Sequence, residues 1–382
     1  MRTEHKRTLA IVTLTAVMMW SYGCTNFIPE TSYEQTSETA GINEEQLMEA
    51  AGITVAGETE ETSESSEETA AETTETTELT EPPKRSVLVT FIGDLTLCSD
   101  ARGGHSARSF NNVVKGDMDY CFDNCKDIFA ADDLTIANLE GAVTTRTGHK
   151  QKQFVFKMAP ENMQMLNNAS IEAVNLANNH SMDFYEAGYQ DTKDNLDSYG
   201  IVWSDQKTSA TYKVGDYLIG MFGICDWDNA NDAYNRIEEL KQAGCNIIIA
   251  TCHWGTEATY QANSKQIYLG HQLIDRGCDI VIGGHPHRLQ PIEKYNGKWI
   301  AYSISNFCFG GNLGLSDPDT VILQCEFVMD ESTGKCVNYK LNVIPYCQTS
   351  SSGNDFHPVA YEWGSSRYYR VLSRLGWSQE DE

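Results

Sequence analysis

Short apolar runs alternate with helix-like patterns along most of this chain, from residue 86 to about residue 345. Uninterrupted apolar runs predict buried strands, whereas apolar residues spaced three and four apart predict amphipathic helices. We expect strands at residues 87–92, 134–138, 171–176, 211–214, 217–223, 246–251, 279–282, 289–295, 298–303, 320–328 and 337–343. We expect helices at residues 119–130, 159–168, 185–199, 232–243 and 264–276. This alternation favours an α/β sheet sandwich.

Polar side chains stand where five of these strands end. They are Asp94, Asn138 with Glu140, Asn179 with His180, His253 with Glu257, and His285 with His287. One such residue is more often a helix cap or a turn residue, but five sets in chain order are hard to explain in that way. Ligands of open α/β sheets bind beyond the carboxyl ends of the strands. Carboxylates, amides and imidazoles suit divalent Zn, Mn or Fe, and a pair of such ions can clamp the oxygens of a phosphoryl displacement.

Six segments in chain order carry a family resemblance. They are FIGD at 91–94, ANLEG at 137–141, LANNHSMD at 176–183, HWGTE at 253–257, GHPH at 284–287 and YSISNF at 302–307. Together they resemble the signatures of the CapA family of bacterial capsule-synthesis proteins, which are associated with poly-γ-glutamate. That family is related to the calcineurin-like metallophosphoesterases. The resemblance therefore implies a four-layer α/β/β/α sandwich with a metal site.

The resemblance also assigns roles to individual residues. It implies metal ligands at Asp94, Glu140, Asn179, His253, His285 and His287. It implies that His180 protonates the leaving group, and we expect Asn138, Glu257 and Asn306 to contact the substrate. Phosphoesterases usually carry a His two positions after the first Asp, where this chain has Thr96, and Glu140 stands where an Asp commonly bridges. The number of divalent ions is therefore one or two, and the scissile bond is a phosphoester or an amide of the polymer.

The first 24 residues have the pattern of an export signal. Basic residues precede a short apolar run, and Gly23-Cys24 follows it, as at a lipoprotein cleavage site. The run is too short for a comfortable membrane span of about 20 residues. We expect a lipid anchor on Cys24, with an uncleaved signal anchor or ordinary secretion as alternatives. All three possibilities place the protein outside the cytoplasmic membrane. A lipid anchor or an uncleaved signal anchor would also attach it to the extracellular face of that membrane.

The remaining organisation follows from composition. Residues 25–85 are rich in Thr, Ser and Glu and poor in aromatic residues, which predicts a disordered tether. Residues 86–345 form the predicted CapA-like domain, and residues 346–382 form a C-terminal extension without a clear pattern. The twelve cysteines show no disulfide framework, and whether they form disulfides stays open.

The charge of the chain bears on its partners. A formal net charge of −26 argues against nucleic acid as a partner, because there is no general attraction to phosphates. We expect an anionic envelope or capsule polymer as substrate, and other capsule-synthesis membrane proteins as further partners. Three functions stay open: a metal-dependent hydrolase or transferase, a non-catalytic factor that holds polymer, and a glycosidase that uses Glu140 and Glu257. The imidazoles favour the first two, because a glycosidase needs only its carboxyl pair.

Overall fold

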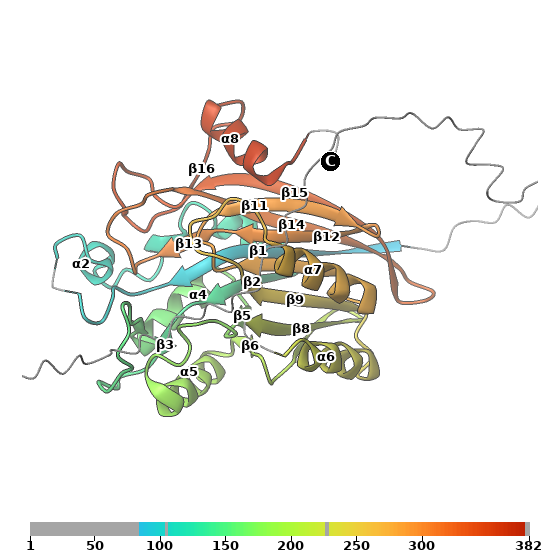
Figure 1. The fold of residues 1–382 in the computed structure, drawn as a ribbon, viewed down its shortest axis with the longest axis horizontal. Helices are drawn as coiled ribbons and strands as arrows, with labels where there is room; N and C mark the ends of the chain where they lie inside the picture. The colour runs from blue at the N-terminus through green and yellow to red at the C-terminus, as the bar shows by residue number, and fades with distance from the viewer. Residues whose placement is uncertain (1–83, 104–105, 226–228, 379–382) are drawn as a thin grey trace, which may run out of the picture. The chain divides into compact units, whose positions relative to one another are not determined.

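The computed structural model describes residues 84–103, 106–225 and 229–378, all within the unit that spans Thr77–Glu382 (Figure 1). The predicted anchor, Cys24 and the tether up to residue 83 lie outside the described residues. None of the helices in the described part of the chain combines the length and the apolar character that crossing a membrane requires.

Two large sheets form the centre of the fold. The first has the order β16-β15-β14-β1-β2-β5-β6, and β13 pairs with β1 beyond the point where β14 leaves it. Its strands are β1 (Lys84–Thr96), β2 (Leu134–Leu139), β5 (Ala173–Asn175), β6 (Val202–Ser204), β13 (Asn306–Phe309), β14 (Asp319–Asp330), β15 (Lys335–Cys347) and β16 (Val359–Ala360). The second has the order β11-β12-β10-β9-β8-β7. Its strands are β7 (Ala210–Val214), β8 (Tyr217–Cys225), β9 (Ile247–His253), β10 (Ile280–Gly284), β11 (Leu289–Tyr295) and β12 (Lys298–Ile304).

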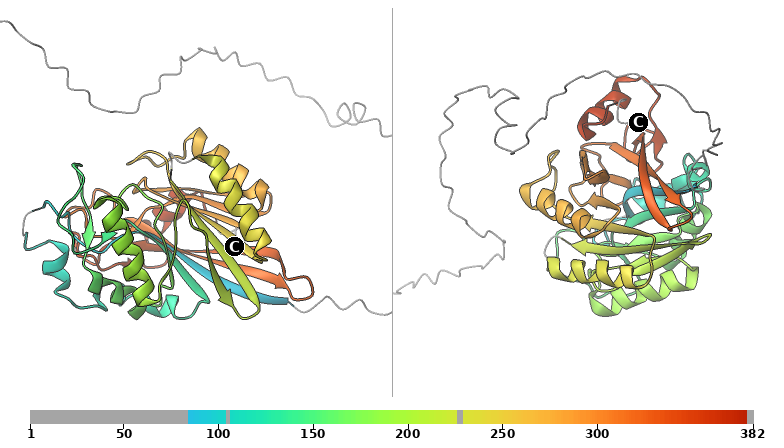
Figure 2. Two further views of the ribbon diagram at one scale, coloured as in Figure 1. Left: turned by 90° about the horizontal axis from the view of Figure 1, so that it is seen from below. Right: turned by 90° about the vertical axis from the view of Figure 1, so that its right-hand side faces the viewer.

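Helices cover the outer face of each sheet (Figure 2). The second sheet buries its outer side chains against α6 (Ala230–Gln242) and α7 (Ser264–Arg276). Part of the first sheet packs against shorter elements and one long helix. These are α2 (Phe110–Val114), η1 (Tyr120–Phe122), α3 (Lys126–Phe129), η2 (Pro160–Met163), α4 (Gln164–Asn168) and α5 (Tyr185–Tyr199). A third core lies between the sheets and contains Phe91, Ile136, Ile249 and Ile282. The expected α/β/β/α sandwich is confirmed.

The expected strands and helices are present with small shifts at their ends, apart from one helix. Residues 119–130 do not form a continuous helix but two short pieces, η1 and α3. The break falls at Cys125, which has φ −138°. Cys121, Phe122, Cys125 and Phe129 are nevertheless all buried. A small sheet of β3 (Ala142–Val143) and β4 (Lys157–Met158), which was not expected, also joins the fold.

The C-terminal segment shares the main core. Residue 345, the predicted end of the domain, lies inside β15, which continues to Cys347. The last helix, α8 (Ser366–Leu375), was not expected from the sequence. Its buried residues Val371, Leu372 and Leu375 belong to the core between the sheets, and Trp377 packs its ring 5.2 Å from that of Trp299. Figure 1 shows α8 above β15 and β11.

Candidate metal centre

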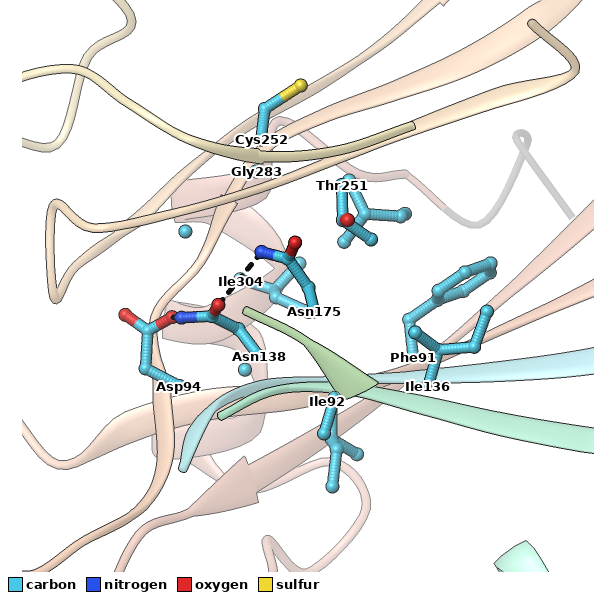
Figure 3. A pocket seen from close by; sticks show the side chains of 14 residues that line it. Phe91, Ile92, Asp94, Ile136, Asn138, Asn175, Thr251, Cys252, Gly283 and Ile304 are labelled. Carbon is cyan, nitrogen blue, oxygen red and sulfur yellow. Dashed lines mark hydrogen bonds between the residues drawn. The ribbon is translucent and has the colours of Figure 1, made fainter. Parts of the chain in front are cut away.

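A row of polar side chains crosses the first sheet where its parallel strands end. Asp94 of β1 is in register with Asn138 of β2, which is in register with Asn175 of β5. The Asn138 amide donates to Asp94 Oδ1 at 2.7 Å, and the Asn175 amide donates to Asn138 Oδ1 at 2.9 Å (Figure 3). The row fixes the Asp94 carboxylate, because Asn138, which binds it, is itself held by Asn175.

Three buried ligand groups meet at this edge. Asp94, Glu140 and His253 each offer an atom, and these atoms lie within 4.8 Å of one another. Glu140 directly follows β2, and His253 is the last residue of β9 in the second sheet. The carboxyl ends of both sheets therefore contribute to one cluster, as the strand-end pattern predicted. Two carboxylates and one imidazole suit Zn, Mn or Fe.

Glu140 is the group that most clearly fits a cation. Its side chain is fully buried, and neither carboxylate oxygen has a hydrogen-bond partner within the described residues. Its Oε1 lies 3.8 Å from Nε2 of both His180 and His253. Burial, and then the charge of Asp94, raise the pKa of Glu140 to about 8. A buried carboxylate without hydrogen bonds is costly, and a divalent cation would supply the missing contacts.

Asp94 is ionised by its surroundings. Burial alone would raise its pKa, but the contact with His287, the nearby His253 and the Asn138 amide outweigh burial and lower the pKa to about 2. The Asp94 carboxylate also accepts the backbone N–H of His285 at 3.2 Å. The cluster therefore keeps at least one fixed negative charge over the whole physiological pH range.

The three histidines predicted as ligands take different positions. His253 is 1% exposed, and burial lowers its pKa well below the ordinary value, which leaves the imidazole neutral as a metal ligand must be. Its Nε2 lies 3.1 Å from Nδ1 of His285 and 2.9 Å from Oδ1 of Asn179. His287 Nδ1 lies 3.5 Å from Asp94 Oδ2 and 2.6 Å from Asn306 Oδ1. His253 thus belongs to the cluster, and Asn179, His285 and His287 border it.

The backbone around two of these histidines is strained. His285 has φ +90° and His287 has φ +51°, a region that non-glycine residues rarely adopt. Such strain persists only where the surrounding structure fixes it, and it concentrates at functional sites. Here the strained turn after β10 brings both imidazoles to the cluster.

His180 occupies a different position, beside the cluster. Its Nδ1 lies 2.7 Å from Asp183 Oδ2, so its Nε2 faces Glu140. Burial lowers the pKa of His180, although Asp183 opposes this shift. Lys152 donates to Asp183 Oδ1 at 2.7 Å and to the backbone oxygen of Asn179 at 2.8 Å. A neutral imidazole whose Nδ1 donates to a carboxylate has an unprotonated Nε2, which can take up a proton and, once protonated, deliver it.

The residues predicted to contact substrate divide into two groups. The Asn138 amide donates to Asp94 and accepts hydrogen bonds from the amides of Asn175 and, at 3.3 Å, Asn178, so it is already occupied by protein groups. Glu257 is exposed, and it lines a space of about 160 Å³ together with His287 and Asn306. A separate cavity of about 20 Å³ beneath the cluster (Figure 3) has room for about one water molecule. Of these two spaces, the larger one has room for more than a water molecule, and we call it the entrance.

The structure explains Thr96, a departure from phosphoesterases, and it also explains the glycine at 284. The Thr96 hydroxyl donates to the backbone oxygen of Glu140 at 2.9 Å, so it positions the ligand that follows β2. A Cβ on Gly284 would lie 2.6 Å from Asp94 Oδ1, so the glycine leaves the space that the carboxylate occupies.

Sequence reasoning missed the residues that support the site. Asp183 follows His180 by three positions, a spacing that could have suggested their contact. Asn175 and Asn178 also stand at the end of β5, next to residues that were recognised. Lys152 lies in a loop far from every strand end, and nothing in its neighbourhood signals its contact with Asp183.

Comparisons with solved structures return distant similarities. A novel phosphatase from Mycoplasma pneumoniae aligns with a TM-score of 0.43 and 15% identity over 69% of this chain and 95% of that one. A 5'-nucleotidase precursor from Thermus thermophilus aligns with a TM-score of 0.42 and 15% identity over 68% of this chain and 54% of that one.

Comparisons with characterised sequences return closer ones. The chain is 33% identical to the PGA biosynthesis protein CapA of Bacillus subtilis over 217 residues, which are 50% of this chain and 57% of that protein. It is 23% identical to the capsule biosynthesis protein CapA of Bacillus anthracis over 329 residues, 77% of this chain and 76% of that protein. The chain thus spans little more than half of the Bacillus subtilis relative. Residues 88–311, which contain every proposed metal ligand, match the model of the bacterial capsule synthesis protein PGA_cap, and this chain belongs to that family.

Proposed function

We propose that this protein is a metal-dependent hydrolase or transferase that acts on a phosphoester during synthesis of a capsule or poly-γ-glutamate polymer. The family and the printed names of its relatives support the biological setting. The chemistry rests on one observation, which is the buried Glu140 carboxylate without hydrogen bonds beside Asp94 and His253. A structural residue has no reason to be left in that state, and the imidazoles beside Glu140 favour a metal site over the carboxyl pair of a glycosidase.

The ligand set follows from the geometry. Asp94, Glu140 and His253 would hold a divalent cation, and Asn179, His285 and His287 stand at its margin. A divalent cation, when bound, polarises a phosphoryl oxygen and favours formation of a nucleophile at neutral pH. Asn138 keeps the Asp94 carboxylate oriented, as groups behind a metal ligand commonly do.

His180 is the residue that we propose as the general acid. Asp183 binds its Nδ1, which leaves Nε2 directed at Glu140 and the cluster. A proton on Nε2 can pass to the leaving oxygen of a substrate that enters past Glu257 and Asn306. Lys152 balances the buried charge of Asp183, and His180 must be protonated on both nitrogens before Nε2 can donate.

We also propose that Cys24 carries the membrane anchor and that the domain works at the extracellular face. The Gly23-Cys24 pair after a short apolar run supports this proposal. Two or more acyl chains hold a protein stably, whereas one holds it only marginally. Cys24→Ser should release the protein or leave its precursor uncleaved. A variant that is still processed and bound to membranes would rule out the lipid anchor.

Metal analysis combined with a screen of chromogenic phosphomonoesters and phosphodiesters tests the proposed activity. We expect the full chain to contain a divalent cation and to turn over at least one ester. His180→Ala should keep the metal and lose most turnover, whereas Asp94→Ala should lose both. A protein that binds metal but turns over no ester, and instead binds the polymer, would favour the non-catalytic role.

A further inference from the structure

A second polar pocket lies beside the entrance to the metal centre. We name it the arginine pocket, because Arg367, Arg370 and Arg374 of α8 line it, opposite Thr349, Ser351 and Ser352. Its volume is about 450 Å³, compared with about 160 Å³ for the entrance. The three arginines are spaced three and four residues apart, which places their guanidinium groups on one face of the helix.

The arginine pocket and the entrance are neighbours. Leu315, Ser316 and Asp317 line both of them, so a single short segment separates the two spaces. Arg288 lines the entrance and donates to Ser316 Oγ at 2.6 Å. A chain-like molecule with one end at His287 can therefore continue past Arg288 into the arginine pocket.

Part of this arginine cluster is structural. Arg370 makes two hydrogen bonds to Asp319, at 2.6 and 2.7 Å, and Arg374 binds Asp317 at 2.8 Å. Both aspartates are buried, at 0% and 6% exposure, and they attach α8 to the rest of the fold. These contacts give Asp317 and Asp319 a structural role. They neutralise only part of the positive charge of the arginines.

The unused charge points to an anionic ligand. Four arginines, at 288, 367, 370 and 374, face three acidic residues, Glu257, Asp317 and Asp319, so the passage keeps an excess of one positive charge in a protein whose net charge is −26. The side chain of Arg367 is exposed and makes no hydrogen bond or ion pair within the described residues. In the facing loop, the Thr349 and Ser351 hydroxyls donate to the backbone oxygen of Gly353, so Ser352 is the hydroxyl that can donate to such a ligand.

We propose that the arginine pocket binds a second anionic group of an extended substrate whose reacting end lies at the metal centre. The ligand is a chain with repeated carboxylate or phosphate groups. Guanidinium groups suit both anions, because their paired N–H donors match carboxylate and phosphate oxygens. The proposal rests on the proposed function for the direction of the substrate, but the binding itself can be tested without turnover.

The test uses two charge reversals in the full chain, Arg367→Glu and Lys335→Glu. Both residues are exposed and both changes alter the net charge equally, but Lys335 lies at the opposite end of β15 from Cys347, which lines the arginine pocket. Fluorescence anisotropy would follow two labelled probes, an oligomer of γ-linked glutamate and a linear oligophosphate. Each titration is run with metal-loaded and with chelator-treated protein.

We expect Arg367→Glu to weaken binding of at least one probe by about 10-fold, because it removes an attraction and adds a repulsion, while Lys335→Glu changes binding by less than about 2-fold. The probe that responds identifies the anion, and the loss should persist without metal. Equal weakening by the two variants, or unchanged binding by Arg367→Glu, would overturn the proposal.

A small phosphodiester separates this proposal from the proposed function. Such a substrate cannot extend into the arginine pocket, so its turnover by the wild-type protein reports on the metal centre alone. If the wild-type protein turns over no ester, the proposed activity fails, while the anisotropy titration still decides the arginine pocket.

Discussion

The imidazole Nδ1 of His180 lies 2.7 Å from carboxylate oxygen Oδ2 of Asp183, and both side chains are buried. The contact determines which nitrogen of His180 faces the cluster of Asp94, Glu140 and His253. The contact also separates proton transfer from metal binding, because Asp183 orients His180 and is not one of the proposed metal ligands.

Asp183→Asn should therefore lower turnover by about 10- to 100-fold without loss of metal, because an amide can stabilise the wrong tautomer of His180. The pH at which activity is half-maximal should also shift, since Asp183 favours protonation of His180. Asp194→Asn, at an exposed position of α5, is the matched control and should behave as wild type. Full turnover with an unchanged pH profile in Asp183→Asn would contradict the assigned role.

Gly284→Ala should weaken metal binding by about 10- to 100-fold, because the new methyl group displaces the Asp94 carboxylate. The affinity can be measured by titration of the chelator-treated protein with Mn or Zn. Gly353→Ala is the control, since nothing lies within 4 Å of the added Cβ there. Equal affinities in the two variants would show that Asp94 is not a ligand.

Leu375→Ala should destabilise the protein by about 2–4 kcal/mol, because Leu375 is fully buried in the core between the sheets. Denaturant unfolding of the full chain measures this loss. Ser373→Ala, at an exposed position of the same helix, should change the free energy of unfolding by less than about 0.5 kcal/mol. If the two midpoints coincide, α8 is an appendage and not part of the core.

The sequence was informative wherever one strand determines both the position and the direction of a residue. Asp94, Glu140 and His253 follow buried apolar runs, and the ends of parallel strands meet at one edge of a sheet. Their meeting could therefore be predicted without any knowledge of side-chain contacts. The hairpin of β11 and β12 was predictable from its turn, because Asn296 and Gly297 favour a tight two-residue connection.

Features that depend on distant segments could not be predicted. Lys152 reaches Asp183 only because the loop that carries it folds back against residues 179–183, which follow β5. The apolar residues of α8 are few, and they became recognisable as core residues only through contacts with both sheets.

The stability of metal-free protein should fall as the pH rises from about 4.5 to about 8. Burial raises the pKa of Glu140 from 4.5 to about 8, so the folded state keeps a proton that the unfolded state loses in this range. The amide of Glu140→Gln cannot ionise. In the presence of chelator, the free energy of unfolding of this variant minus that of wild type should therefore be near zero at about pH 4.5 and largest near pH 8. Parallel stability curves for the two proteins would show that Glu140 is not held as a buried acid.

The metal content of wild type, Glu140→Gln and Glu257→Gln tests the central claim most directly. Both variants replace a carboxylate with an amide, but Glu140 is buried beside Asp94 and His253, whereas Glu257 is exposed at the entrance. After incubation with Mn, Zn or Fe and removal of free ion, we expect wild type and Glu257→Gln to retain a divalent cation in stoichiometric amount and Glu140→Gln to retain little. Equal metal content in all three proteins, or none in wild type, would contradict a metal centre at this cluster.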